Sequence, residues 1–172
     1  MTTHTFFIPG KPAAWGIVLA GRFLGHKGGK PLISTTANLR SRPKGSSAPK
    51  EQFPKGWKAN AVKVITAAWK GDPPITGPVL LDVVAVFPRT KGLDCRHKRK
   101  PCSCTPEKLD GRSVPHTSTP DRTNILKLAE DAVVAAGVIE DDRLVWGGTK
   151  PTVKRYAATG EEPGVTITVT KN

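Results

Sequence analysis

Residues 119–137 constrain the fold more than any other stretch, because they predict an amphipathic helix together with both of its ends. Thr119 suits the N-cap, Pro120 suits the first helical position, and Gly137 suits a left-handed residue that ends the helix. Apolar residues recur at helical spacing along one face, namely Ile125, Ala129, Ala132, Val133 and Ala136. We therefore expect one face of this helix to pack against the protein while the other presents polar groups.

Acidic residues stand at the start of this helix, on its polar face and directly after its end. Asp121 lies where the positive end of the helix macrodipole favours an anion. Lys127 and Asp131 are four residues apart and share the polar face. If the chain turns back into a strand after the helix, Asp141 and Asp142 return towards Asp121.

Carboxylates gathered in this way would repel one another unless a cation lay between them. Hard oxygen ligands suit Mg²⁺ or Mn²⁺. Such an ion can activate water and neutralise the charge of a phosphate during an in-line displacement. Lys127 would add a positive charge near the scissile group or the leaving oxygen. The alternative from spacing alone is that these acids are ordinary solvated residues of a helix start and a turn.

The charge balance indicates a polyanionic partner. The chain has 172 residues, with 27 Lys and Arg against 14 Asp and Glu, so its net charge is +13. A basic surface around a small acidic cluster is what a metal-dependent nuclease requires. No apolar run approaches the roughly 20 residues needed to cross a bilayer, and the N-terminus lacks a signal-peptide core. We therefore expect a soluble, cytoplasmic protein.

The rest of the chain predicts one α/β domain over residues 1–172. A second helix is expected at 56–70, with Trp57, Val62, Ile65 and Trp69 facing the core. Segments rich in β-branched or aromatic residues and bounded by Gly or Pro predict strands at 5–8, 79–87, 144–147, 152–156 and 165–170. The expected fold is a single-domain sandwich with a mixed β-sheet and two main helices.

A basic segment, residues 21–55, contains Gly, Pro and many cations but little apolar periodicity. This pattern predicts a long loop, which is either a mobile DNA-binding arm or an ordinary solvated loop. In an arm, the phosphate contacts would come from Arg40, Arg42, Lys44, Lys50 and Lys55.

A second loop, residues 89–118, contains all three cysteines of the chain. Cys95, Cys102 and Cys104, with His97 between the first two, could supply the three thiolates and one imidazole of a closed Zn²⁺ site. Three reduced loop thiols are the alternative, because the spacing lacks the usual Cys-x₂-Cys pair. The odd count and a cytoplasmic location disfavour disulfides. His116 lies downstream and five residues before Asp121, where it could also line a catalytic site.

Several of these segments, taken in order, resemble the RusA family of Holliday junction resolvases, the crossover junction endodeoxyribonucleases. The stretch from Asp121 to Val145 resembles the core motif of the family. Residues 6–12, Phe-Phe-Ile-Pro-Gly-Lys-Pro, resemble its opening strand and turn, and residues 77–88 resemble its central strand. Lys154 and Arg155 resemble a late basic strand that would contact DNA.

This resemblance implies a RusA-like fold and a homodimeric, Mg²⁺-dependent endonuclease that cuts branched DNA, four-way junctions in particular, by paired nicks. It also suggests a phage or prophage origin. By motif position, Asp121 and Asp142 match metal-ligand carboxylates, Lys127 matches the catalytic lysine, and Asp141 is the adjacent acid.

One departure from the family pattern affects the predicted metal site. Thr123 stands where the family usually has a second Asp. A hydroxyl carries no negative charge, so affinity for the ion should fall unless Asp131, Glu130 or Asp141 substitutes. The arginines that often follow the N-terminal turn are also replaced, by residues 13–17, Ala-Ala-Trp-Gly-Ile. A second function therefore stays open, that of a protein of the same fold that binds branched DNA without cutting it.

Overall fold

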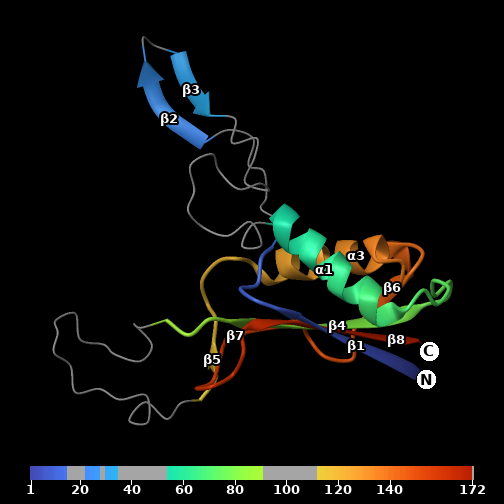
Figure 1. The fold of residues 1–172 in the computed structure, drawn as a ribbon. Coiled ribbons are helices and arrows are strands. Elements are labelled where there is room, and N and C mark those ends of the chain that lie inside the picture. Colours follow the sequence, from blue (N-terminus) through green and yellow to red (C-terminus); the bar gives the residue numbers. More distant parts are fainter. Residues whose placement is uncertain (15–21, 28–29, 35–53, 91–111, 172) are drawn as a thin grey trace.

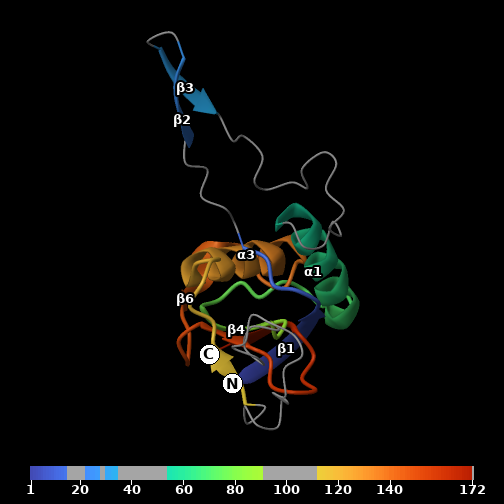
Figure 2. The ribbon, with the colours of Figure 1, turned by 90° about the vertical axis from the view of Figure 1, so that its left-hand side faces the viewer.

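The computed structural model describes residues 1–14, 22–27, 30–34, 54–90 and 112–171. Within these residues a mixed six-stranded sheet carries two helices on one of its faces (Figure 1). The view at 90° shows the same two layers, with both helices on the same side of the sheet (Figure 2). The predicted α/β class with a mixed sheet and two main helices is confirmed.

The sheet is built around one long central strand. Its strands, in chain order, are β1 (Thr2–Pro9), β4 (Val79–Phe87), β5 (Val114–Pro115), β6 (Val145–Gly147), β7 (Val153–Tyr156) and β8 (Gly164–Lys171). The spatial order is β1-β8-β4-β7-β5, and β8 is antiparallel to both β1 and β4. The first part of β4 pairs with β6 and its last part pairs with β7, both in parallel. The five predicted strands are therefore present, with ends that differ by a few residues.

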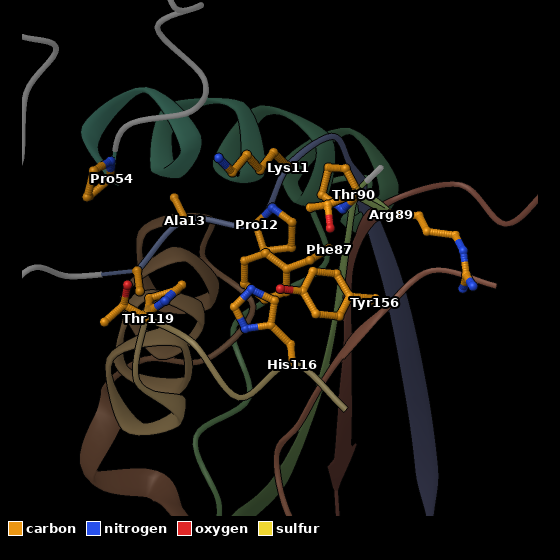
Figure 3. Close-up of a pocket in the computed structure, with 13 residues that line it drawn as sticks. Lys11, Pro12, Ala13, Pro54, Phe87, Arg89, Thr90, His116, Thr119 and Tyr156 are labelled. Atoms are coloured by element: carbon orange, nitrogen blue, oxygen red, sulfur yellow. The ribbon is translucent and has the colours of Figure 1, made fainter. Parts of the chain in front are cut away.

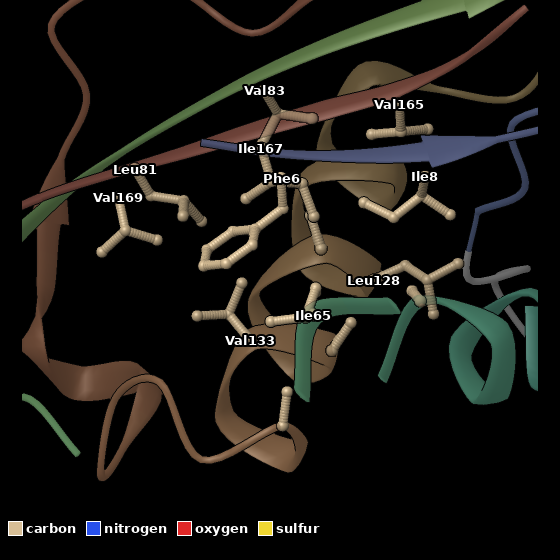
Figure 4. Close-up of a cluster of buried hydrophobic side chains, with 14 of the residues drawn as sticks. Phe6, Ile8, Ile65, Leu81, Val83, Leu128, Val133, Val165, Ile167 and Val169 are labelled. Carbon is tan, nitrogen blue, oxygen red and sulfur yellow. The ribbon is translucent and has the colours of Figure 1, made fainter. Parts of the chain in front are cut away.

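The helices are α1 (Pro54–Trp69) and α3 (Arg122–Ala135), and they enclose the core against the sheet (Figure 4). The side chains predicted to face the core from α3 are all buried. On α1, Trp57, Ile65 and Trp69 are buried and Val62 packs against the core from a partly buried position. No helix in the described part of the chain is long and apolar enough to span a membrane.

The predicted start of α3 is wrong by two residues, and its predicted end is confirmed. The N-cap is Asp121 rather than Thr119, and Pro120 precedes the helix instead of occupying its first position. The carbonyls of Ser118 and Pro120 accept hydrogen bonds from Lys154 Nζ at 2.5 and 2.8 Å, which fixes this segment outside the helix. Gly137 has a φ of 75° and terminates the helix in the left-handed conformation, as its position predicts.

The prediction of a loop throughout residues 21–55 is also wrong in part. Strands β2 (Arg22–Lys27) and β3 (Lys30–Ser34) form an antiparallel hairpin inside it, and α1 begins at Pro54. Two glycines stand between the paired strands in the sequence, which is a common signal for a two-residue hairpin connection. The loop prediction rested on the basic composition of the surrounding segment and missed this signal.

Candidate active site

The segment after α3 brings the chain back across the end of the helix layer. Beyond Gly137, Ile139 forms a parallel bridge with Ile75, and Ile75 exchanges backbone hydrogen bonds with Val138 and Glu140 at 2.9 and 3.2 Å. The chain then enters the short 3-10 helix η3 (Asp142–Leu144) and continues into β6. This path fixes the two motif acids at the junction between the helix layer and the sheet.

Asp131, Asp141 and Asp142 line one hollow, together with Glu140 and with Lys58 of α1. We call this the acidic hollow. Asp141 caps η3, because its Oδ1 accepts a hydrogen bond from the Arg143 amide at 2.9 Å. Its side chain also lies 3.7 Å from Arg143 Nε. The structure therefore brings together three of the four acids predicted as metal ligands.

Asp121 does not line the acidic hollow. It is the N-cap residue of α3, without a side-chain capping hydrogen bond, whereas Asp131 lies in the last turns, and ten residues of α-helix span about 15 Å. Among the described residues, no group of three or more His, Cys, Asp or Glu is placed to hold a metal ion by itself. Asp141 and Asp142 were expected to return towards Asp121. In the structure they lie beside the C-terminal half of the helix instead.

Glu130 lies near Asp142 of the acidic hollow and near Thr123, which stands where the RusA pattern usually has a carboxylate. It lines a groove with Arg122, Thr123 and Leu126 on one side and the β6–β7 segment on the other. Burial raises the pKa of Glu130, and the charges of Asp142 and Asp131 raise it further, while Lys127 acts in the opposite direction. Glu130 is therefore close enough to Asp142 for their charges to interact, and a cation beside them would relieve this repulsion.

The wall of this groove is fixed by an acid of the central strand. Asp82 accepts hydrogen bonds from the Thr149 hydroxyl and, at 2.9 Å, from the Lys150 amide. Gly148 lies so close to β4 that an added Cβ would meet the Leu81 carbonyl at 2.7 Å and Asp82 Oδ1 at 2.8 Å. The β6–β7 segment is thus held against β4, and it presents the exposed Trp146 at the groove.

The predicted DNA-binding residues fall into three groups. Lys55 is exposed in the first turn of α1. Lys154 and Arg155 on β7 are partly buried and have intramolecular partners: Lys154 holds the segment before α3, and Arg155 pairs with Glu161 through two hydrogen bonds of 2.6 and 2.5 Å. The others lie outside the described residues: Arg40, Arg42, Lys44 and Lys50. Their contacts with DNA stay predictions.

The predicted zinc ligands Cys95, His97, Cys102 and Cys104 also lie outside the described residues, so the zinc site stays a prediction. His116 is described and buried. Its ring stacks on Phe87 with the centroids 3.9 Å apart and lies 4.6 Å from the ring of Tyr156. Burial lowers the pKa of His116, and the nearby charge of Lys154 lowers it further, which favours the neutral ring at pH 7.

One feature of the site has no clear signal in the sequence, and a second has only a partial one. Lys58 reaches the acidic hollow through the packing of α1 against α3, which joins segments more than 50 residues apart. Glu130 lies seven residues after Thr123, which places both on one side of α3. That spacing is visible in the sequence, but it does not show which side of the helix borders the groove.

The arrangement described so far is that of an α/β protein with acids clustered at one end of a helix in a strongly basic chain, which suits a protein that acts on a polyanion. A family model described as Endodeoxyribonuclease RusA matches residues 30–170. The chain therefore belongs to the RusA family of endodeoxyribonucleases, and the resemblance drawn from the sequence is confirmed. A comparison with curated proteins gives no match.

Proposed function

We propose that the protein is a divalent-metal-dependent, structure-selective endodeoxyribonuclease that resolves four-way DNA junctions by paired nicks. The observation that carries the proposal is the family match over residues 30–170, combined with the acidic hollow at the position of the family motif. The net charge of +13 supports an extended contact with the DNA backbone. We also propose that the protein acts in the cytoplasm of a bacterium and that a phage or prophage encodes it.

The side chains present fit a hard cation such as Mg²⁺ or Mn²⁺. Asp142 is the proposed central ligand, with Asp131 and Asp141 beside it in the acidic hollow. Mg²⁺ typically binds one or two carboxylates and keeps several water molecules or substrate phosphate oxygens, so it does not need all three acids of the hollow as direct ligands. When bound, the ion would lower the pKa of a water molecule and neutralise charge on the scissile phosphate.

We propose that Glu130 supplies the negative charge that Thr123 lacks. Both residues line the same groove, and the raised pKa of Glu130 reflects burial and its interaction with Asp142. Asp131 is the other candidate, because it lies in the acidic hollow itself. Asp121, which the motif also assigns to the metal, lies at the start of the helix and outside the acidic hollow, so its role as a ligand stays a prediction.

Lys127 is proposed to hold the scissile phosphate and to stabilise charge on it as the bond breaks. It is exposed on α3, and its charge acts on Glu130, so it lies near the same acids. A fixed cation aimed at a developing negative charge acts mainly in the transition state. Lys55, Lys154 and the basic residues outside the described part would bind the arms of the junction through their phosphates.

A homodimer is the assembly proposed to make two nicks. A four-way junction has approximate two-fold symmetry, and its resolution into two duplexes needs symmetric nicks in opposing strands. A two-fold dimer carries two copies of one site related by the matching operation. Sedimentation with and without junction DNA would measure the assembly, and a monomer that nicks both strands in concert would contradict it.

A second function has one specific observation in its favour. Thr123 replaces a family carboxylate, and no three acids in the described ranges are placed to hold an ion by themselves. A protein of this kind could bind branched DNA without cutting it. Incubation of a synthetic four-way junction with Mg²⁺ or Mn²⁺ separates the two functions: the nuclease makes paired nicks, whereas the binding protein shifts the junction in a gel and leaves it intact.

A further inference from the structure

We propose that a cavity beside the start of α3 binds one nucleobase that leaves the DNA stack next to the cleavage site. This proposal rests on the proposed function, because it assumes that Lys127 of α3 holds the scissile phosphate. The cavity has a volume of about 700 Å³ and is lined by residues of five separate segments. This volume falls within the range of small-molecule sites, about 300–1,000 Å³.

Aromatic and proline rings form the floor of this cavity (Figure 3). Phe87, His116 and Tyr156 make a continuous set of ring contacts, and Pro12 lies against them. Phe87 and His116 are almost fully buried, so the partly exposed ring of Tyr156 is the one that could stack on a base, which such contacts do without regard to its Watson–Crick partner. A base that has left the stack is the part of DNA that needs such a surface, because a paired base already has its faces covered.

Polar groups around the rings could distinguish one base from another. His116 is 7% exposed, and its buried Nδ1 has no hydrogen-bond partner among the described residues. The side chains of Thr90 and Thr119 also border the cavity (Figure 3). A neutral imidazole offers one donor and one acceptor, and hydroxyls offer both, which are the groups that recognise base edges.

The charges around the cavity favour a polyanionic ligand over a neutral one such as an uncharged peptide. Lys11 and Arg89 line it, and Lys154 is close enough to act on His116. Arg89 is held in place by the carbonyls of Arg112 and Ala157, at 2.8 and 3.2 Å. No acidic side chain from the described ranges lines the cavity. The phosphates on either side of an inserted base would therefore meet cations.

The cavity lies next to the start of the acidic motif of α3. Thr119 and Pro120 line it, and the next residue is Asp121. Lys127, which is proposed to hold the scissile phosphate, lies in the second turn of the same helix, so a nucleotide in the cavity would lie near the nick. Recognition of that nucleotide would make cleavage depend on the base at one position next to the nick.

The test uses four-way junctions that differ at one nucleotide at a time, within two positions of the nick. Each position carries each of the four bases or an abasic site, and kcat/KM is measured. Stacking of one base on an aromatic platform corresponds to about a five- to 150-fold effect. At one position, the abasic site should lower kcat/KM of the wild-type protein within this range, and the four bases should differ from one another.

Thr90→Trp fills the cavity from an exposed position. This variant should cut all five versions of the sensitive substrate at the slow rate of the abasic one. Thr159→Trp, at an exposed position outside the cavity, is the matched control and should behave like the wild type. His116→Phe keeps a ring beside Phe87 but removes the nitrogens, so it should reduce the differences among the four bases more than the effect of the abasic site.

Equal cutting of the abasic and normal junctions by the wild type would overturn the proposal. So would base preferences that persist unchanged in Thr90→Trp, which would mean that another surface, or another part of this chain in the cavity, accounts for them. If the wild type cuts no junction at all, the proposed function fails instead. The same base series, measured as affinity for a short single strand, then tests the cavity alone, and affinity that ignores the abasic site overturns it.

Discussion

Replacing Glu130 by glutamine should stabilise the metal-free protein. Burial and the charges of Asp142 and Asp131 raise the pKa of Glu130 in the folded state. An acid of this kind makes folding less favourable once the pH exceeds its unfolded pKa, and the loss is complete above its folded pKa. Glutamine has a similar shape and no charge, so Glu130→Gln removes this loss at pH 7.

The size of the effect follows from the partial burial of the side chain. Exposed charge pairs contribute about 0.2–1 kcal/mol, and fully buried charges cost several kcal/mol. Because Glu130 lies between these cases, we expect a gain of about 1 kcal/mol in the free energy of unfolding. For a protein of this size, that gain raises the melting temperature by about 2–4 °C.

The sign should reverse when Mg²⁺ is present, because the proposed role of Glu130 is to attract the cation. Mg²⁺ stabilises the folded protein by an amount that grows with its affinity. Thermal melts of the wild type and Glu130→Gln, with chelator and with a series of Mg²⁺ concentrations, measure both effects. Glu162→Gln, at an exposed position away from the acidic hollow, is the control. A lower melting temperature in chelator, or an undiminished response to Mg²⁺, would refute the reasoning.

Four further outcomes follow from the site and the core. Asp142→Asn should abolish detectable cleavage and leave junction binding in a gel shift intact; equal loss of both would show that it is no metal ligand. Lys127→Ala should lower kcat by about 10²–10³ with little change in affinity, and an unchanged kcat would mark a solvent-facing lysine. Thr123→Asp should reduce the Mg²⁺ concentration for half-maximal cleavage by about tenfold, the equivalent of about 1.4 kcal/mol, and no reduction would mean that Glu130 or Asp131 already fills the role. Leu128→Ala, at a fully buried position of α3, should lower the free energy of unfolding by about 3 kcal/mol in chemical denaturation, and a loss below about 1 kcal/mol would contradict the observed packing.

Local patterns predicted the parts of the fold that depend on local rules. The apolar spacing of α3 identified its buried face, and Gly137 identified its end, because periodicity and left-handed glycine are properties of a few neighbouring residues. The start of α3 was misplaced, since Lys154, more than 30 residues away, holds the carbonyls before it. The β2–β3 hairpin was missed because the prediction for this segment relied on its basic composition.

The candidate site was predictable in its residue types but not in its arrangement. The motif indicated acids and a lysine, yet the grouping of Asp131 with Asp141 and Asp142 depends on how the chain turns after Gly137. The groove shared by Glu130 and Thr123 depends on the β6–β7 segment that Asp82 anchors. The aromatic cavity combines Phe87, His116 and Tyr156 from three separate segments, and no periodic pattern connects them.

Cleavage of a synthetic four-way junction tests the central proposal most directly. The junction is labelled on each strand in turn and incubated with the wild-type protein in Mg²⁺, in Mn²⁺ and in chelator, with Asp142→Asn as the inactive control. We predict symmetric nicks in two opposing strands that require the divalent ion and are absent with the variant. A junction that is bound but stays intact with both ions, or nicks that persist in chelator, would contradict the proposal.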